Sequence, residues 1–314
     1  MGKAKSLMGI SSELDEIIRD FAFLGNHYSE FHPSNAGDVS QVLSSSIERK
    51  VLSKFRASFT RWFDLPRIET LSQVRNDGRH GYRSQGVKDQ GFYRRLKSLA
   101  GRLLLITRTG SQIPAILQTI QTGESGKLLN IIQVDKTGYK IRIVYGNAQY
   151  GSIPSIETHV HLLANSLSVA DGIETPAAVH CHPYNLVLLA RHGKIQGNFE
   201  KFNAILYTQI EGILRNYPDL IGLVPYQESG SEALVLGSIK ELKRHRLVLW
   251  MNHGLVARAE NIRRAYTLID YAEVCASASI DSLQFQAIGI PFEKMKQFLD
   301  EKKLTRAYKL LKLK

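Results

Sequence analysis

Ala178-Val-His-Cys-His-Pro183 is a short apolar run that ends in two histidines one residue apart. If this stretch is a β-strand, its side chains alternate between the two faces, which places His180 and His182 on one face and Cys181 on the other. Two imidazoles on one face can bind a single metal ion. Ordinary histidines can produce the same pattern, so this stretch alone leaves both a metal site and a plain strand open.

A third histidine follows a second apolar run, Leu247-Val-Leu-Trp-Met251, within the tripeptide Asn252-His-Gly254. Three imidazoles leave one or two positions open on a zinc ion, which is typical of a catalytic rather than a structural site. The sequence therefore predicts that His180, His182 and His253 bind zinc or another divalent metal.

Glu157 lies four residues before His161, and this spacing places both side chains on one face of a helix. A carboxylate beside a metal-bound substrate oxygen can move a proton on the neighbouring carbon, because the metal stabilises the enediolate that remains. Without a metal site, an ordinary Glu–His pair is the simpler interpretation. Two polar loops, Ser34–Asp38 and Thr109–Ser111, add hydroxyl and backbone N–H groups of the kind that bind phosphate.

Strands and helices around these motifs mix irregularly instead of repeating as βαβ units. We expect helices where apolar residues recur every three or four positions, and strands where short apolar runs end in turn residues. The expected helices cover 11–25, a segment beginning at 153–157, 200–215 and 262–279, and the expected strands cover 103–107, 128–134, 139–144, 177–182 and 246–251. A turn with positive φ at Gly138 should join the strands at 128–134 and 139–144.

The chain has 314 residues, of which 43% are hydrophobic, and a net charge of +12. This composition excludes collagen-like, disulfide-rich and disordered proteins. The chain has two cysteines. Its apolar runs are shorter than the roughly 18 residues of a membrane-spanning helix. We therefore expect a protein of the reducing cytoplasm without a membrane segment.

Basic residues are concentrated in two segments. Residues 49–98 contain thirteen Lys and Arg against four Asp and Glu, and residues 291–314 contain eight against three. No nucleic-acid-binding motif accompanies them, and solvated charge around an ordinary core is the simpler interpretation. We expect one domain over residues 1–290 with a basic insertion at about 49–98, then a basic helix at 291–314, and no nucleic-acid partner.

The order of these motifs resembles that of the class II aldolase and adducin family. The resemblance spans residues 12–285 and rests on Ser34-Asn-Ala-Gly-Asp-Val-Ser40, Thr109-Gly-Ser111, Pro154-Ser-Ile-Glu-Thr-His-Val-His161, His180-Cys-His-Pro183 and Asn252-His-Gly254. Its more specific part is the combination of His-x-His with a distant His-Gly and an upstream Glu.

The resemblance implies a three-layer α/β/α fold with a central, largely antiparallel sheet, assembled as a homotetramer with sites between subunits. It implies that His180, His182 and His253 hold zinc and that Glu157 is the catalytic acid/base. The implied contacts to substrate or phosphate come from small polar residues: Asn35, Gly37, Thr109, Gly110, Ser111 and Ser155. The implied reaction cleaves a ketose 1-phosphate of the rhamnulose or fuculose type into dihydroxyacetone phosphate and a small aldehyde.

Three features depart from the family pattern. Asp38 stands where the family has asparagine, and Gln112 replaces a glycine. A second glutamate, which related enzymes take from a neighbouring subunit, has Glu211 as its nearest counterpart. If Asp38 faces a phosphate, an arginine from the basic segment 49–98 or Arg108 has to offset its charge.

These departures leave two alternatives to the aldolase open. One is a related sugar lyase or epimerase that acts on a different sugar, and the other is a non-catalytic adducin-like scaffold. A scaffold needs no open metal site, so the three histidines and Glu157 favour the enzyme.

Overall fold

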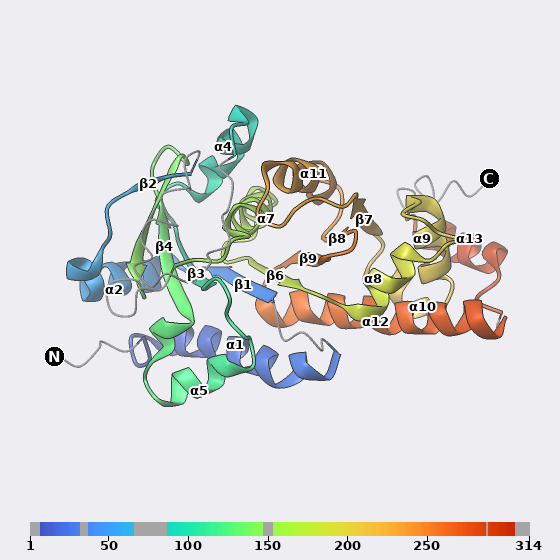
Figure 1. The fold of residues 1–314 in the computed structure, drawn as a ribbon, viewed down its shortest axis with the longest axis horizontal. Coiled ribbons are helices and arrows are strands. Elements are labelled where there is room, and N and C mark those ends of the chain that lie inside the picture. Colours follow the sequence, from blue (N-terminus) through green and yellow to red (C-terminus); the bar gives the residue numbers. More distant parts are fainter. Residues whose placement is uncertain (1–6, 32–36, 66–86, 147–152, 287, 305–314) are drawn as a thin grey trace.

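Nine strands form one sheet across the middle of the molecule (Figure 1). The computed structural model describes residues 7–31, 37–65, 87–146, 153–286 and 288–304. The strands are β1 (Gly37–Val42), β2 (Phe63–Asp64), β3 (Leu103–Thr107), β4 (Leu129–Val134), β5 (Lys140–Tyr145), β6 (Ala177–Cys181), β7 (Ile221–Val224), β8 (Leu247–Trp250) and β9 (Gly254–Ala259). Their order is β2-β5-β4-β3-β1-β6-β9-β8-β7. Every neighbouring pair is antiparallel except β7 and β8, which confirms the largely antiparallel sheet.

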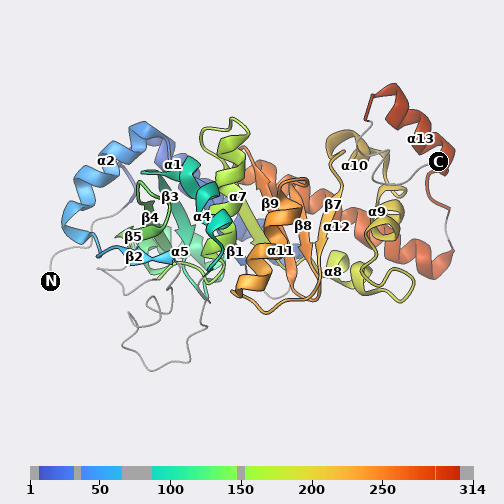
Figure 2. The same ribbon diagram turned by 90° about the horizontal axis from the view of Figure 1, so that it is seen from above.

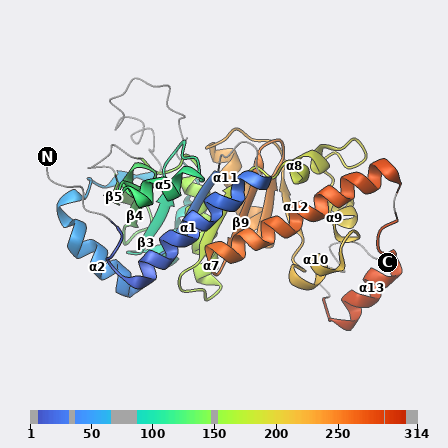
Figure 3. The same ribbon diagram turned by 90° about the horizontal axis from the view of Figure 1, so that it is seen from below.

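Helices cover both faces of this sheet and complete the predicted three-layer α/β/α fold. One face carries α4 (Gln90–Leu96), α7 (Thr158–Ala170) and α11 (Glu232–Leu242), which lie above the sheet in Figure 1 and toward the viewer in Figure 2. The other face carries α1 (Ser12–Phe31) and α12 (Ile262–Phe285), which contact each other. Both helices lie in front of the sheet in Figure 3, which shows the molecule from below.

Smaller helices add side chains to the core beneath the sheet. They are α2 (Ser45–Phe55), α5 (Ala115–Gln121), α8 (Tyr184–Arg191), α9 (Phe199–Tyr207), α10 (Glu211–Asn216) and α13 (Phe292–Glu301). The described residues also include the short 3₁₀ helices η1 (Arg56–Ser58), η3 (Lys97–Leu99) and η4 (Ser125–Lys127). No helix among the described residues combines the length and apolarity needed to cross a membrane.

The strands have apolar side chains on both faces because both faces are covered. In β3, Leu103 and Leu105 belong to the core that contains α1 and α12, whereas Leu104 and Ile106 belong to the core that contains α7 and α11. This alternation follows from the two-residue period of a strand. It explains why β3 appears in the sequence as a continuous apolar run.

The first helix is longer than its sequence suggests. We expected it to end near Gly25, but α1 continues to Phe31. A glycine inside a helix costs only about 1 kcal/mol relative to alanine. A single glycine at position 25 is therefore too weak a signal to end the helix.

The helix expected at 200–215 is in fact two helices, α9 and α10. The chain leaves the helical path at Thr208, whose carbonyl accepts a hydrogen bond from the backbone N–H of Ile290 at 2.6 Å. The Thr208 carbonyl would accept a hydrogen bond within the helix if the helix continued, but Ile290, far along the chain, occupies it instead. No local pattern reveals such a contact.

The basic segments fall partly within the described structure. Residues 49–65 and 87–98 include most of α2 together with β2 and α4, whereas residues 66–86 of the expected basic insertion lie outside the described residues. In the C-terminal segment, α13 buries Met295 and Leu299 in the core, and residues 305–314 lie outside the described part of the chain.

Candidate metal centre

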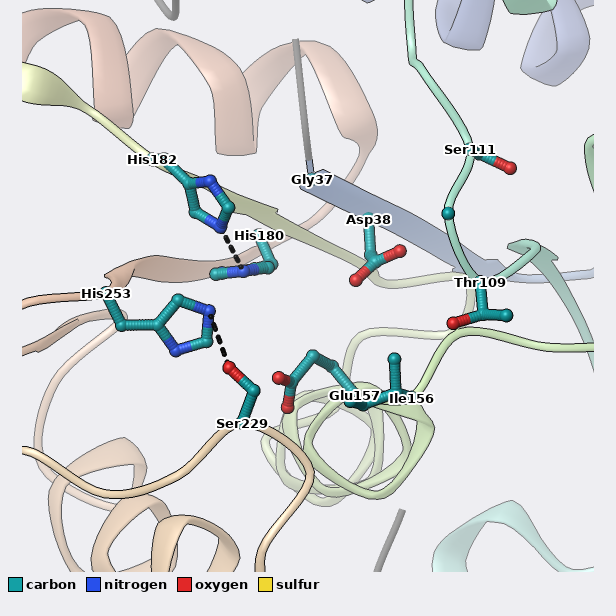
Figure 4. A pocket seen from close by; sticks show the side chains of 11 residues that line it. Gly37, Asp38, Thr109, Ser111, Ile156, Glu157, His180, His182, Ser229 and His253 are labelled. Carbon is teal, nitrogen blue, oxygen red and sulfur yellow. Dashed lines mark hydrogen bonds between the residues drawn. The ribbon is translucent and has the colours of Figure 1, made fainter. Parts of the chain in front are cut away.

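Three histidines converge at the end of β6 (Figure 4). His180 lies within β6, His182 directly follows that strand, and His253 lies in the turn between β8 and β9. One ring nitrogen from each lies within 4.8 Å of the other two. The Nε2 atoms of His180 and His182 are 3.2 Å apart. The fold thus brings the three predicted ligands to one point, while Cys181 is buried in the core on the opposite face.

The turn that carries His253 depends on its two neighbours. Asn252 has φ +60°, in the left-handed region that asparagine tolerates better than most residues. At Gly254, an added Cβ would lie 2.4 Å from the Cys181 carbonyl oxygen and 2.7 Å from Cδ2 of His182. Only glycine lets β9 approach β6 this closely. Asn252 and Gly254 therefore allow the backbone conformation that brings His253 close to His180 and His182.

The ring of His180 is held in a ligand-like orientation. Its Nδ1 lies 3.0 Å from the backbone carbonyl of Leu255, and because a carbonyl only accepts, Nδ1 carries the hydrogen. The Nε2 lone pair then faces the other two histidines, an arrangement common among metal-binding histidines. The ring also packs against Trp250, with ring centroids 4.6 Å apart.

Burial keeps the histidines neutral, which is the form that binds metal. Desolvation is the largest cause in each case: it lowers the pKa of His180 well below its usual value, lowers that of His182, and lowers that of His253 to about 4. Proximity of His182 lowers the pKa values of His180 and His253 further.

The residues fit a divalent ion such as zinc. The donor set is three imidazole nitrogens, the set that zinc accepts when other positions stay open. In addition, Nδ1 of His253 is buried and has no hydrogen-bond partner among the described residues, while its Nε2 lies 3.3 Å from the Ser229 hydroxyl. Figure 4 shows Nε2, the nitrogen beside Ser229, on the side of the His253 ring toward His180 and His182.

Glu157 enters the same cavity from the start of α7, where it occupies the N-cap position. Its side chain is buried, and Oε2 has no hydrogen-bond partner among the described residues. Burial first, and then the nearby Asp38 carboxyl, raise the pKa of Glu157 to about 8, while the backbone N–H of Gly230 lowers it. Such a carboxyl can take up and release a proton near neutral pH.

Asp38 faces the cavity from β1 (Figure 4). Burial raises its pKa to about 6, against hydrogen bonds from Ser155 and Thr107 that lower it. Above that pH the carboxylate form of Asp38 therefore predominates. Arg108 does not line this cavity, and its Nη1 donates to the Lys127 carbonyl at 3.2 Å instead. Arg108 therefore does not offset the negative charge of Asp38.

The cavity has a volume of about 370 Å³. It is lined by Gly37, Asp38, Thr109, Gly110, Ser111, Ile156, Glu157, His180, His182, Ser229 and His253. Gly110, at φ +68°, forms the turn that presents its two neighbours to this space.

Two of the residues implied by the family pattern are not part of this lining. Ser155 lies beside the cavity, where its hydroxyl accepts a hydrogen bond from the Glu157 N–H at 3.0 Å. Asn35 lies outside the described residues.

Ser229 and Ile156 line the cavity although sequence reasoning did not select them. Ser229 belongs to Glu228-Ser-Gly-Ser231, a small polar loop before a helix whose N-cap is Ser231. This is the same kind of signal that marked Thr109–Ser111, so it could have been used. Ile156 had no signal, because an isoleucine between Ser155 and Glu157 is an ordinary apolar residue.

His161 and Glu211 lie elsewhere. His161 is fully buried between α7 and the sheet, where its Nδ1 lies 2.7 Å from the Ser40 hydroxyl of β1, and it does not line the cavity. Glu211 is exposed on α10 and pairs with Arg215 at 2.6 Å. Within one chain, Glu211 therefore does not reach the three histidines.

The buried His161 predicts a pH dependence of stability. Desolvation lowers its pKa to about 3, so the folded protein keeps it neutral while the unfolded chain takes up a proton below about pH 6.5. The free energy of unfolding should therefore fall by about 1.4 kcal/mol per pH unit from this group as the pH decreases from 6.5 toward 3. In His161→Asn, urea unfolding at several pH values should show a slope that is smaller by this amount, whereas His192→Asn should keep the full slope. An unchanged slope in His161→Asn would mean that His161 is charged in the folded protein.

The fold and the site together define a class of protein: a three-layer α/β/α domain with three histidines and a buried glutamate around one cavity. The family described as "Class II Aldolase and Adducin N-terminal domain" matches residues 120–280. The chain belongs to the class II aldolase and adducin family.

Among curated relatives, the chain is similar to rhamnulose-1-phosphate aldolases. The protein from Pectobacterium atrosepticum is 27% identical over 187 residues, which cover 59% of this chain and 65% of that protein. The protein from Listeria monocytogenes is 22% identical over 180 residues, which cover 57% of this chain and 63% of that protein. The matched part thus spans less than two thirds of these relatives.

Solved structures share the fold. A sugar-phosphate aldolase from Thermotoga maritima gives a TM-score of 0.59 at 22% identity, covering 88% of this chain and 99% of that one. A structure described as L-fuculose 1-phosphate aldolase gives 0.51 at 16% identity, covering 93% and 97%. These likenesses confirm the fold of the family.

Proposed function

We propose that this chain is a zinc-dependent aldolase that cleaves a ketose into a three-carbon ketone and a small aldehyde. One observation carries the proposal: three histidine nitrogens within 4.8 Å of one another and the buried carboxyl of Glu157 face the same cavity. The names of the relatives suggest a ketose 1-phosphate of the rhamnulose or fuculose type, which would yield dihydroxyacetone phosphate.

In this proposal, His180, His182 and His253 hold the ion. When bound, a divalent ion supplies a positive charge that stabilises negative charge developing on the ketose oxygens. The hydrogen bond from His180 Nδ1 to the Leu255 carbonyl fixes the ring that points Nε2 inward. Because the side chains of His180 and Glu157 are buried, charges beside them interact more strongly than they would in water.

Glu157 is the proposed acid/base. Its protonated form gives a proton to the nucleophilic carbon of the three-carbon unit in the cleavage direction, and its ionised form removes that proton in the reverse direction. The hydrogen bond from the Glu157 N–H to Ser155 fixes the backbone at this point. The orphaned Oε2 atom is consistent with a partner that arrives with the substrate.

The remaining cavity residues would position the substrate. Gly37, Thr109, Gly110 and Ser111 supply hydroxyl and backbone groups opposite the histidines. On the basis of the family pattern, we also propose that Asn35 and Ser155 contact the substrate. Assembly as a homotetramer and a cytoplasmic location belong to the same proposal, the latter because both cysteines are buried free thiols.

A direct test measures ketone release by zinc-loaded protein, with a chelator-treated sample as control. The substrates are rhamnulose 1-phosphate, fuculose 1-phosphate and the two unphosphorylated ketoses. Chelator-sensitive release from any of them supports the aldolase. If zinc binds stoichiometrically but none is cleaved, the aldolase proposal is wrong and a lyase or epimerase for another sugar takes its place. If no zinc binds, the scaffold alternative takes its place.

A further inference from the structure

Asp38 is held in place on β1, on the strand that pairs with the one carrying His180. In the pairing of β1 with β6 its register partner is His180, so both side chains lie on the same face of the sheet. The Thr107 hydroxyl donates to Asp38 Oδ1 at 3.3 Å and accepts from the Val39 N–H at 3.0 Å. Strand pairing and this network fix the carboxylate, which therefore cannot swing away from a bound ligand.

Among the residues that the structure describes, the end of the cavity around Asp38 is lined by side chains with hydroxyl groups. Thr109 Oγ1 is buried and lacks a hydrogen-bond partner among the described residues, whereas the Ser111 hydroxyl donates to the Leu128 carbonyl. Ile156 contributes an apolar surface. Of the residues that the structure describes, no Lys or Arg lines this cavity.

Asp38 and Thr109 can form hydrogen bonds with a sugar hydroxyl more completely than with a phosphate. An ionised carboxylate only accepts hydrogen bonds, and a phosphate dianion also has only acceptors, so the two repel and cannot bond. A sugar hydroxyl both donates and accepts. It can donate to Asp38 while it accepts from the unpartnered Thr109 hydroxyl, and both buried groups are then satisfied.

We infer that the Asp38 end of the cavity receives an uncharged hydroxyl group, so that the substrate is an unphosphorylated ketose. This inference rests on the proposed aldolase function and narrows its substrate class. It assigns Asp38 as a specificity-determining residue that selects against phosphate.

The test uses two metal-chelating probes that differ by one phosphate, glycolohydroxamate and phosphoglycolohydroxamate. Their dissociation constants are measured by calorimetry on zinc-loaded protein. The wild type should bind the phosphorylated probe no more tightly than the unphosphorylated one. In Asp38→Asn, the preference should shift toward the phosphorylated probe by about tenfold or more, because one nearby like charge is gone.

Asp281→Asn is the matched control, since Asp281 is exposed on α12 and does not line the cavity. It should leave the preference unchanged, and zinc content should stay equal in all three proteins. A wild type that prefers the phosphorylated probe tenfold or more, with Asp38→Asn unchanged, overturns the inference while the aldolase proposal stands. Zinc-loaded protein that binds neither probe overturns both.

Discussion

A His182→Ala variant is expected to lose the metal ion and all metal-dependent ketose cleavage. The imidazole of His182 lies 3.2 Å from that of His180, and its removal leaves two ligands for an ion that takes at least three from the protein. Loss of an outer partner of a metal ligand already costs about 10–100-fold in affinity, so loss of a ligand should cost more. Equilibrium dialysis against zinc, with metal analysis of the retained protein, measures the effect.

His192→Ala is the matched control for this variant. His192 lies just beyond the C-terminal end of α8 and does not line the cavity, so its loss should leave zinc content and rate as in the wild type. If His182→Ala retains stoichiometric zinc, the assignment of the three histidines as ligands is wrong.

A Glu157→Gln variant is expected to keep its metal and to lose about two to four decades in cleavage rate. An amide has nearly the same shape as the carboxyl but cannot exchange a proton, and a positioned acid/base contributes about 10²–10⁴-fold. The measurement is the initial rate at saturating substrate, in samples with equal zinc content.

Glu273→Gln offers a control at another buried glutamate. Glu273 accepts hydrogen bonds from the N–H groups of Asn185 and Leu186 at 2.8 and 2.9 Å, at the start of α8, and it does not line the cavity. Its replacement should lower stability and leave the rate of zinc-loaded protein close to wild type. An unchanged rate in Glu157→Gln would remove Glu157 from the mechanism.

Much of the fold could be predicted because its signals are local. Leu103–Thr107 is a continuous apolar run and forms β3 with the same bounds. Gly138 has φ +80° in the predicted turn between β4 and β5. By contrast, β7 has only four residues and was not expected, and α11 was not expected although Leu234, Ile239 and Leu242 recur on its buried face. Their stability comes from pairing and packing with distant segments, which a local pattern does not contain.

The candidate site divides in the same way. The two-residue period of β6 predicts that His180 and His182 share a face, because this depends only on strand geometry. That His253 meets them depends on the close approach of β9 at Gly254, which sequence spacing does not fix. The position of Asp38 opposite His180 likewise follows from the register of β1 against β6.

The order of the strands divides the sheet where β6 meets β9. On one side of that junction the strands come from residues 37–181, and on the other side from residues 221–259. His180 and His182 belong to the first part, and His253 belongs to the second. An ion held by all three histidines would connect two parts of the sheet whose strands are distant in sequence. Bound metal would then add to the stability of the junction between β6 and β9, as well as supply the chemistry of the site.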